Sequence, residues 1–130
     1  MAQFALHLLA YLVPTFLIGY FWHLKWFHDR YRQLNIYRAE PIIPLGFSSM
    51  LVQGCIVAYV YPRLVASPGS FADAFLFSAG AALLSWSFTT LAVAAKHSMA
   101  SVRGYLALET AFTAAQFTLV APLLALTSRS

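Results

Sequence analysis

Histidine and glutamate are the residues of this sequence whose types and positions could support chemistry near neutral pH. His23 and His28 lie five positions apart, and His97 follows much later in the chain. Glu109 is a carboxylate well inside a long apolar stretch. Imidazole nitrogens bind metal ions and haem iron, and burial of a carboxyl group favours a bound proton. The sequence therefore suggests two kinds of site, a metal or haem centre and a carboxylate that binds a proton or a ligand.

The number of histidines restricts the metal hypothesis. The spacing of His23 and His28 matches one fragment of the histidine motifs of membrane di-iron hydroxylases and desaturases, but those enzymes need more histidines than this chain has. A haem b group held by His23 and His97 is an alternative, because both are expected at the same membrane face. Histidine is also common without a ligand at such an interface. We therefore expect no metal and no bound cofactor.

The chain offers no arrangement of residues typical of an enzyme. Serines are frequent, but none has a histidine and a carboxylate placed beside it by a recognisable pattern, as an activated nucleophile needs. A glycine-rich phosphate-binding loop is also absent. The single cysteine, Cys55, cannot form an intrachain disulfide. We expect a non-enzymatic protein.

The composition excludes a water-soluble domain. Hydrophobic residues make up 61% of the chain and charged residues 9%, whereas about 25% of the residues of a soluble domain are charged. Most of the surface must therefore face lipid. The basic residues behind the net charge of +4 lie mainly between the apolar stretches, which favours contact with anionic lipid headgroups over nucleic acid.

Four apolar stretches are long enough to cross a bilayer as helices, at residues of about 4–24, 45–64, 71–95 and 102–127. We expect one transmembrane domain over residues 1–130, an all-α integral membrane protein folded as an antiparallel four-helix bundle. The first stretch lacks a basic leader and a small-residue cleavage site, so we expect it to remain as a helix. The expected location is the inner (cytoplasmic) membrane of a bacterium, as a multi-pass protein.

The distribution of basic residues predicts the orientation. The first and third loops hold six of the eight Lys and Arg residues, and the other side holds Arg63 and Arg129. Cytoplasmic loops of membrane proteins carry the excess of Lys and Arg. We therefore expect the first and third loops in the cytoplasm and both termini outside.

The segment at about residues 25–41 is rich in aromatic and basic residues. Aromatic rings prefer the headgroup layer, and long basic side chains reach lipid phosphates from it. We expect a cytoplasmic interfacial segment that follows the membrane surface. Its expected anchors, including the end of the preceding helix, are Trp22, Lys25, Trp26, Arg30, Arg32 and Arg38.

Polar residues inside the apolar stretches are stronger functional candidates, because they are costly to place in a membrane. Glu109, Thr113 and Gln116 share one helical face, and we expect Gln53 and Thr90 at a similar depth on other helices. Two interpretations stay open. These groups either join the helices by hydrogen bonds without a further role, or they form a polar pocket open to the cytoplasm. In such a pocket Glu109 would carry a proton or a cation, or would bind a ligand.

Small residues recur at a spacing of three or four in the last two apolar stretches. Small residues let helices approach closely in lipid. We expect the third and fourth helices to pack as a pair, although the same face would suit a homodimer. The residues concerned are Ala74, Ser78 and Ala82, and then Gly104, Ala107, Ala111 and Ala115.

Three segments carry a resemblance to small bacterial four-helix inner-membrane protein families of unknown function: GYFWHLKWF (Gly19–Phe27), EPIIPLGF (Glu40–Phe47) and SFTTLAVA (Ser87–Ala94). The resemblance covers most of the chain and implies a four-helix membrane fold, without an activity or catalytic residues. The four-span length is also similar to that of small multidrug-resistance exporters. Their essential glutamate lies in the first helix, which has none here, so Glu109 would have to act from the fourth.

Three functions follow as hypotheses. The leading one is a membrane binding or accessory protein for a lipid-like ligand or for a larger membrane complex. The first alternative is a small proton-coupled transporter that uses Glu109 and works as a homodimer. The second is a haem-binding electron carrier that uses His23 and His97.

Overall fold

The computed structural model describes all 130 residues and consists of helices without any strand. Two elements, η1 and η2, are single π-helical turns that continue the helix before them. In chain order the elements are α1 (Ala2–Phe21), η1 (Trp22–Trp26), α2 (His28–Leu34), α3 (Ile43–Leu64), α4 (Phe71–Trp86), η2 (Ser87–Leu91), α5 (Ala92–Lys96) and α6 (Val102–Thr127).

Four continuous helical rods are long and apolar enough to cross a membrane. They are Ala2–Trp26, Ile43–Leu64, Phe71–Lys96 and Val102–Thr127, with mean hydropathies between 1.4 and 1.7. Each covers the ~30 Å hydrocarbon core at a rise of about 1.5 Å per residue. The prediction of an all-helical chain with four apolar helices of this length is confirmed.

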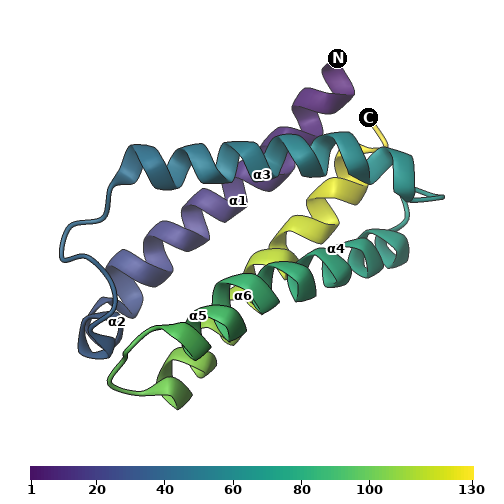
Figure 1. Ribbon diagram of the computed structural model, residues 1–130. Helices are drawn as coiled ribbons and strands as arrows, with labels where there is room; N and C mark the ends of the chain where they lie inside the picture. Colours follow the sequence, from purple (N-terminus) through teal and green to yellow (C-terminus); the bar gives the residue numbers. More distant parts are fainter.

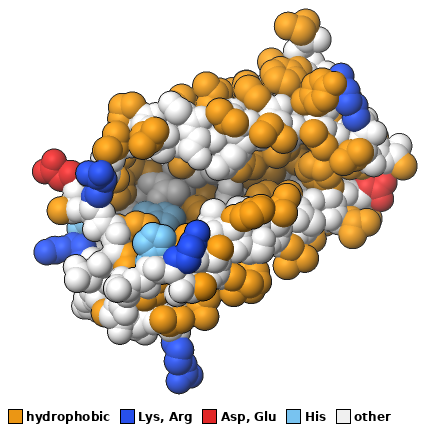
Figure 2. Space-filling model, in the orientation of Figure 1, with side chains coloured by type: hydrophobic (Ala, Val, Ile, Leu, Met, Phe, Trp, Pro, Cys, Tyr) orange, Lys and Arg blue, Asp and Glu red, His pale blue; other side chains and the backbone are white.

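The helices α1 and α6 form the centre of the molecule. α1 packs against both α3 and α6, and α6 packs against both α1 and α4. α3 and α4 have no extensive contact with each other and stand apart in front of the inner pair (Figure 1). Figure 2 shows an elongated hollow between them, with hydrophobic side chains along both rims. The four rods therefore form an open arrangement in which each outer helix leans on one inner helix.

The two ends of the molecule differ in charge. Both chain termini lie at the end that also holds the α3–α4 turn, and we call this the terminal end (Figure 1). The other end holds α2 and the loop between α5 and α6, and we call it the α2 end. Lys and Arg side chains gather there in Figure 2. These residues are Lys25, Arg30, Arg32, Arg38, Lys96 and Arg103, against Arg63 and Arg129 at the terminal end.

α4 packs against α6, as expected for the third and fourth helices. Ala74 and Ser78 of α4 are buried where α4 packs on α6. Ala107 and Ala111 of α6 are exposed. They lie two positions before and after the buried Glu109, and two positions correspond to about 200° around a helix. They therefore lie on the side of α6 opposite Glu109, whose side chain contacts His23 of η1.

The segment after α1 folds back onto α6. Tyr31 and Leu34 of α2 are buried together with Tyr105 of α6. The Leu34 carbonyl accepts a hydrogen bond of 3.1 Å from the backbone N–H of Ala100, which ties α2 to the loop before α6. α2 ends at Asn35, whose φ of 59° is left-handed, a conformation that asparagine adopts more readily than most residues. This docking fixes α2 beside the end of α1.

Candidate functional site

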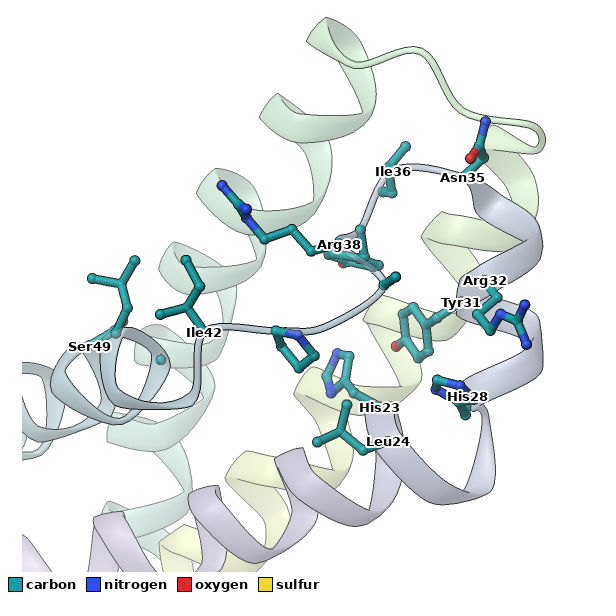
Figure 3. Close-up of a pocket in the computed structure, with 15 residues that line it drawn as sticks. His23, Leu24, His28, Tyr31, Arg32, Asn35, Ile36, Arg38, Ile42 and Ser49 are labelled. Atoms are coloured by element: carbon teal, nitrogen blue, oxygen red, sulfur yellow. The ribbon is translucent and has the colours of Figure 1, made fainter.

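A cavity of about 780 Å³ lies at the α2 end, between the end of α1, α2, the loop 35–42 and the start of α3 (Figure 3). Small-molecule sites have volumes of roughly 300–1,000 Å³. The polar residues that line the cavity are His23, His28, Tyr31, Arg32, Asn35, Tyr37, Arg38 and Ser49. The apolar ones are Leu24, Ile36, Ala39, Pro41, Ile42 and Leu45, and Gly46 completes the wall.

The cavity exists because the start of α3 diverges from the end of α1 (Figure 1). The first buried residue of α3 is Gly54, eleven positions after its start at Ile43. A Cβ atom added at Gly54 would meet Leu8 Cδ1 at 2.8 Å, so α3 touches α1 closely at this point. Towards the α2 end the two helices diverge. The loop 35–42 spans the resulting gap, with Ile42 in an extended conformation before the proline at the helix start.

The lining of the cavity is positively charged. It contains Arg32, Arg38, His23 and His28, and it contains no Asp or Glu. In the view of Figure 3 the rings of His23, His28 and Tyr31 gather on one side of the loop 35–42, and Arg38 extends towards the other side, where Ile42 and Ser49 lie. The arrangement offers hydrogen-bond donors and positive charge to an anionic group, next to apolar walls.

Glu109 of α6 lies behind this lining and is held by two side chains. Glu109 is 7% exposed. The Tyr31 hydroxyl donates a hydrogen bond of 2.6 Å to Glu109 Oε1, and His23 Nε2 lies 3.3 Å from the same oxygen. The Trp22 indole N–H donates to the Tyr31 hydroxyl at 3.1 Å, so the Tyr31 proton is directed at Glu109. We call these four residues the Glu109 cluster.

The π-helical turn η1 orients the imidazole of His23. His23 Nδ1 lies 3.1 Å from the Gly19 carbonyl, which can only accept a hydrogen bond, so Nδ1 carries a proton. Glu109 Oε1 already accepts a hydrogen bond from Tyr31. Nε2 must then also carry a proton, which it donates to this oxygen. An imidazolium that faces a carboxylate in this way satisfies every donor and acceptor. Single π-helical turns within α-helices frequently occur at functional sites.

Tyr31 is a fixed donor in this cluster. Burial, followed by the negative charge of Glu109 and its hydrogen bond, raises the pKa of Tyr31 far above its ordinary value of 10.0. The hydroxyl therefore keeps its proton over the physiological pH range. The rings of His23 and Tyr31 lie 4.5 Å apart between centroids, and Phe112 of α6 packs edge-on against His23 at 4.6 Å. These contacts restrict the imidazole to one orientation.

A second group of polar side chains lies nearer the middle of the rods. Gln116 of α6 donates to the Tyr11 hydroxyl at 3.3 Å and to the Thr15 hydroxyl at 3.2 Å, both on α1. Tyr11 in turn donates to Gln53 of α3 at 2.7 Å, and Gln53 donates to Ser49 at 3.0 Å. This Tyr11 cluster joins α1, α3 and α6 by hydrogen bonds.

The polar residues expected to converge at one depth are thus divided between two places. Glu109 belongs to the Glu109 cluster, and Gln53 and Gln116 belong to the Tyr11 cluster. Thr113 is 7% exposed and lies on α6 between the two clusters. Thr90 in η2 is fully buried, and its hydroxyl has no hydrogen-bond partner.

Sequence reasoning missed the partners of Glu109. From the sequence, His23 is expected to be an interfacial or haem-binding residue, and the aromatic rings of residues 25–41, which include Tyr31, are expected in the headgroup layer. A signal for them exists, because His7, Tyr11, Thr15, Gly19 and His23 follow one another at intervals of four and form a stripe that winds slowly around the first helix. All but His23 are buried, and His23 keeps 28% of its side chain exposed towards the cavity.

The two histidines considered as haem ligands, His23 and His97, lie in different surroundings. Both ring nitrogens of His23 are engaged, with Gly19 and with Glu109, so binding to iron would break the Glu109 contact. His97 follows α5, is exposed, and has its Nδ1 3.1 Å from the Val93 carbonyl. No group of three or more His, Cys, Asp or Glu side chains is arranged to hold a metal ion.

The expected interface anchors divide into two kinds. Lys25, Trp26, Arg30, Arg32 and Arg38 are exposed. Trp22 instead directs its indole N–H to Tyr31 and packs its ring against those of Phe27 and Phe112.

Comparison of the chain with protein-family models, with curated proteins and with solved structures gave no match.

Proposed function

We propose that this protein is a multi-pass protein of the bacterial inner membrane that binds an anionic phospholipid in the cavity at the α2 end. The observation that carries the proposal is the lining of that cavity, which combines two arginines and two histidines with apolar walls and contains no carboxylate. In this proposal the α2 end faces the cytoplasm and both termini face outwards, because six of the eight basic residues lie at the α2 end.

The headgroup would lie among the basic side chains. A phosphodiester carries one negative charge, and arginine binds phosphate oxygens with two parallel N–H donors. Arg32 from α2 and Arg38 from the loop 35–42 contribute to the same cavity from different elements. Each basic residue near an anionic membrane surface contributes about 1 kcal/mol to lipid binding.

The acyl chains would occupy the hollow between α3 and α4. This hollow has apolar rims (Figure 2). Leu45 of α3, which lines the cavity, is 66% exposed, so apolar surface of α3 is accessible next to the headgroup site. A lipid chain packed there covers apolar surface of the two outer helices and fills the space between them.

The test compares two short-chain lipids with the protein in a neutral detergent, by titration calorimetry. Dioctanoyl phosphatidylglycerol should bind about tenfold or more tightly than dioctanoyl phosphatidylcholine. Arg38→Gln and Arg32→Gln should each weaken phosphatidylglycerol binding about fivefold. Arg63→Gln, at the terminal end, is the matched control and should leave the affinity unchanged. Equal affinity for both lipids, or an equal loss in Arg63→Gln, would overturn the proposal.

A second candidate function is proton-coupled transport through Glu109, by the single chain or by a homodimer. The specific observation in its favour is the run of polar side chains along the α1–α6 interface, from Glu109 past Thr113 to the Tyr11 cluster. The test is a pH jump applied to proteoliposomes that contain a pH-sensitive dye. Protein-dependent proton flux that is lost in Glu109→Gln would support transport, and flux that the variant retains would exclude a role of Glu109 in it.

A further inference from the structure

We infer that the cavity binds its anion together with a proton, and that the pair His23–Glu109 takes up this proton from solvent. The inference rests on the proposed function, because it concerns the same cavity and the same anionic ligand. It adds that one hydrogen ion is taken up per bound anion, and it names the two side chains that bind this ion.

The first step is the position of His23 between two groups. One edge of its imidazole faces Glu109 at 3.3 Å, and 28% of its side chain is exposed in the cavity wall. Its positive charge is therefore available to a ligand but is already balanced by the carboxylate behind it. An anion that enters the cavity competes with Glu109 for this charge.

The second step is the free oxygen of Glu109. The Tyr31 and His23 contacts both go to Oε1. A proton from solvent can therefore add to Oε2 without breaking either contact. Protonation converts Glu109 into a neutral acid, and the imidazolium of His23 then faces the anion without competition. Because binding and protonation favour each other, the coupling must be reciprocal: the anion raises proton affinity, and protons raise anion affinity.

The third step is the exclusion of other titrating groups. Tyr31 of α2 and Tyr37 of the loop pack their rings against His23, and Tyr105 of α6 lies near Glu109. Phenols are neutral between pH 5 and 8. Arg32 and Arg38 are charged throughout this range. Of the side chains in the cavity wall, only His28 could also change its charge there, and it is removed by substitution in the test.

The test measures proton uptake directly with dioctanoyl phosphatidylglycerol, whose phosphodiester does not titrate between pH 5 and 8. Calorimetric titration at pH 7 in two buffers of different ionisation enthalpy gives the number of protons taken up on binding. We expect a clear uptake, up to one proton per lipid, and an affinity that rises as the pH falls, by at most tenfold per pH unit. The His28→Gln variant should bind more weakly, because His28 lines the cavity, but it should take up the same number of protons per bound lipid.

The double variant His23→Gln/Glu109→Gln is the decisive comparison. It has the same net charge as the wild-type pair with one shared proton and keeps Arg32 and Arg38, so at pH 8 it should show weaker but measurable binding of phosphatidylglycerol. Its proton uptake should vanish, and its affinity should not change with pH. Uptake that persists in the double variant, or that is lost in His28→Gln, would overturn the inference. Wild-type binding without uptake would overturn it while leaving the proposed function intact, whereas absence of binding would overturn both.

Discussion

His23 Nε2 lies 3.3 Å from Glu109 Oε1, although 86 positions separate the two residues in the chain. The contact joins the end of α1 to α6, directly behind the wall of the basic cavity. It depends on the π-helical turn η1, which directs Nδ1 to the Gly19 carbonyl and Nε2 to the carboxylate. The pair thus links the packing of the two central helices to the proposed binding site.

The first prediction concerns the energetic coupling of this pair. Glu109→Gln and His23→Gln should each lower the free energy of unfolding, because each leaves the other polar group without its partner. The double variant should be more stable than the sum of the two losses predicts, with a coupling energy of about 1–2 kcal/mol. The measurement is unfolding by titration from mild detergent into SDS. Additive losses would show that the two side chains do not interact.

The second prediction concerns the Tyr11 cluster. Tyr11→Phe removes the hydroxyl that accepts from Gln116 and donates to Gln53. The free energy of unfolding in SDS should fall by about 0.6–1.7 kcal/mol, which are the average and the largest values measured for polar contacts between membrane helices. Tyr59→Phe is the matched control, because Tyr59 is 56% exposed and should tolerate the change. An equal effect of both substitutions would contradict a specific role of the Tyr11 hydroxyl.

The third prediction concerns the closest approach of α3 to α1. Gly54→Val should destabilise the protein by about 1–3 kcal/mol, because the added atoms collide with Leu8 and Tyr11. Gly80→Val in α4 is the control, since a Cβ atom there would meet nothing within 4 Å. Thermal unfolding in detergent compares the two. If Gly80→Val lowered the melting temperature as much as Gly54→Val, the α1–α3 contact would not be the cause.

The fourth prediction concerns alkaline pH. Burial and the charge of Glu109 raise the pKa of Tyr31 above its ordinary value of 10.0, so above pH 10 the unfolded chain releases a proton that the folded protein retains. The stabilisation is complete below pH 10 and is lost as the pH rises, by up to about 1.4 kcal/mol per pH unit. Tyr31→Phe should therefore show a weaker dependence between pH 10 and 11. A dependence as steep as that of the wild type would contradict the assignment.

The fifth prediction concerns orientation. In a Cys55→Ser background, a cysteine introduced at Ser130 should react with a membrane-impermeant maleimide on intact bacterial cells. A cysteine introduced at Ala39, in the loop 35–42, should react only after the membrane is opened. These results follow from the excess of basic residues at the α2 end. The reverse pattern of labelling would place the cavity outside the cell.

The helices could be predicted from the sequence because each is specified locally. A run of about 20 apolar residues is enough to indicate a rod, and the observed rods begin and end within two residues of the predicted ones. Ser70 and Ser101 cap the helices that follow them by accepting from Asp73 and Gly104 N–H groups, so the boundaries are also set by neighbouring residues.

The site could not be predicted to the same degree, because it depends on contacts between distant segments. The polar face of the fourth helix was visible, but the partners of Glu109 come from the first helix and from α2, which had been expected to lie along the membrane surface. The fold-back of α2 rests on the burial of Tyr31 and Leu34 against Tyr105, and no local pattern records it. The cavity arises from the divergence of α3, which is likewise a property of the assembled helices.

Native mass spectrometry of the protein purified from a bacterial membrane in mild detergent tests the central claim most directly. The account predicts a retained anionic phospholipid on the wild-type chain. Loss of this lipid is predicted for Arg32→Gln/Arg38→Gln at the cavity, and its retention for Arg63→Gln/Arg129→Gln at the terminal end. A wild-type protein that carries no lipid, or one that loses its lipid equally in both double variants, would contradict the account.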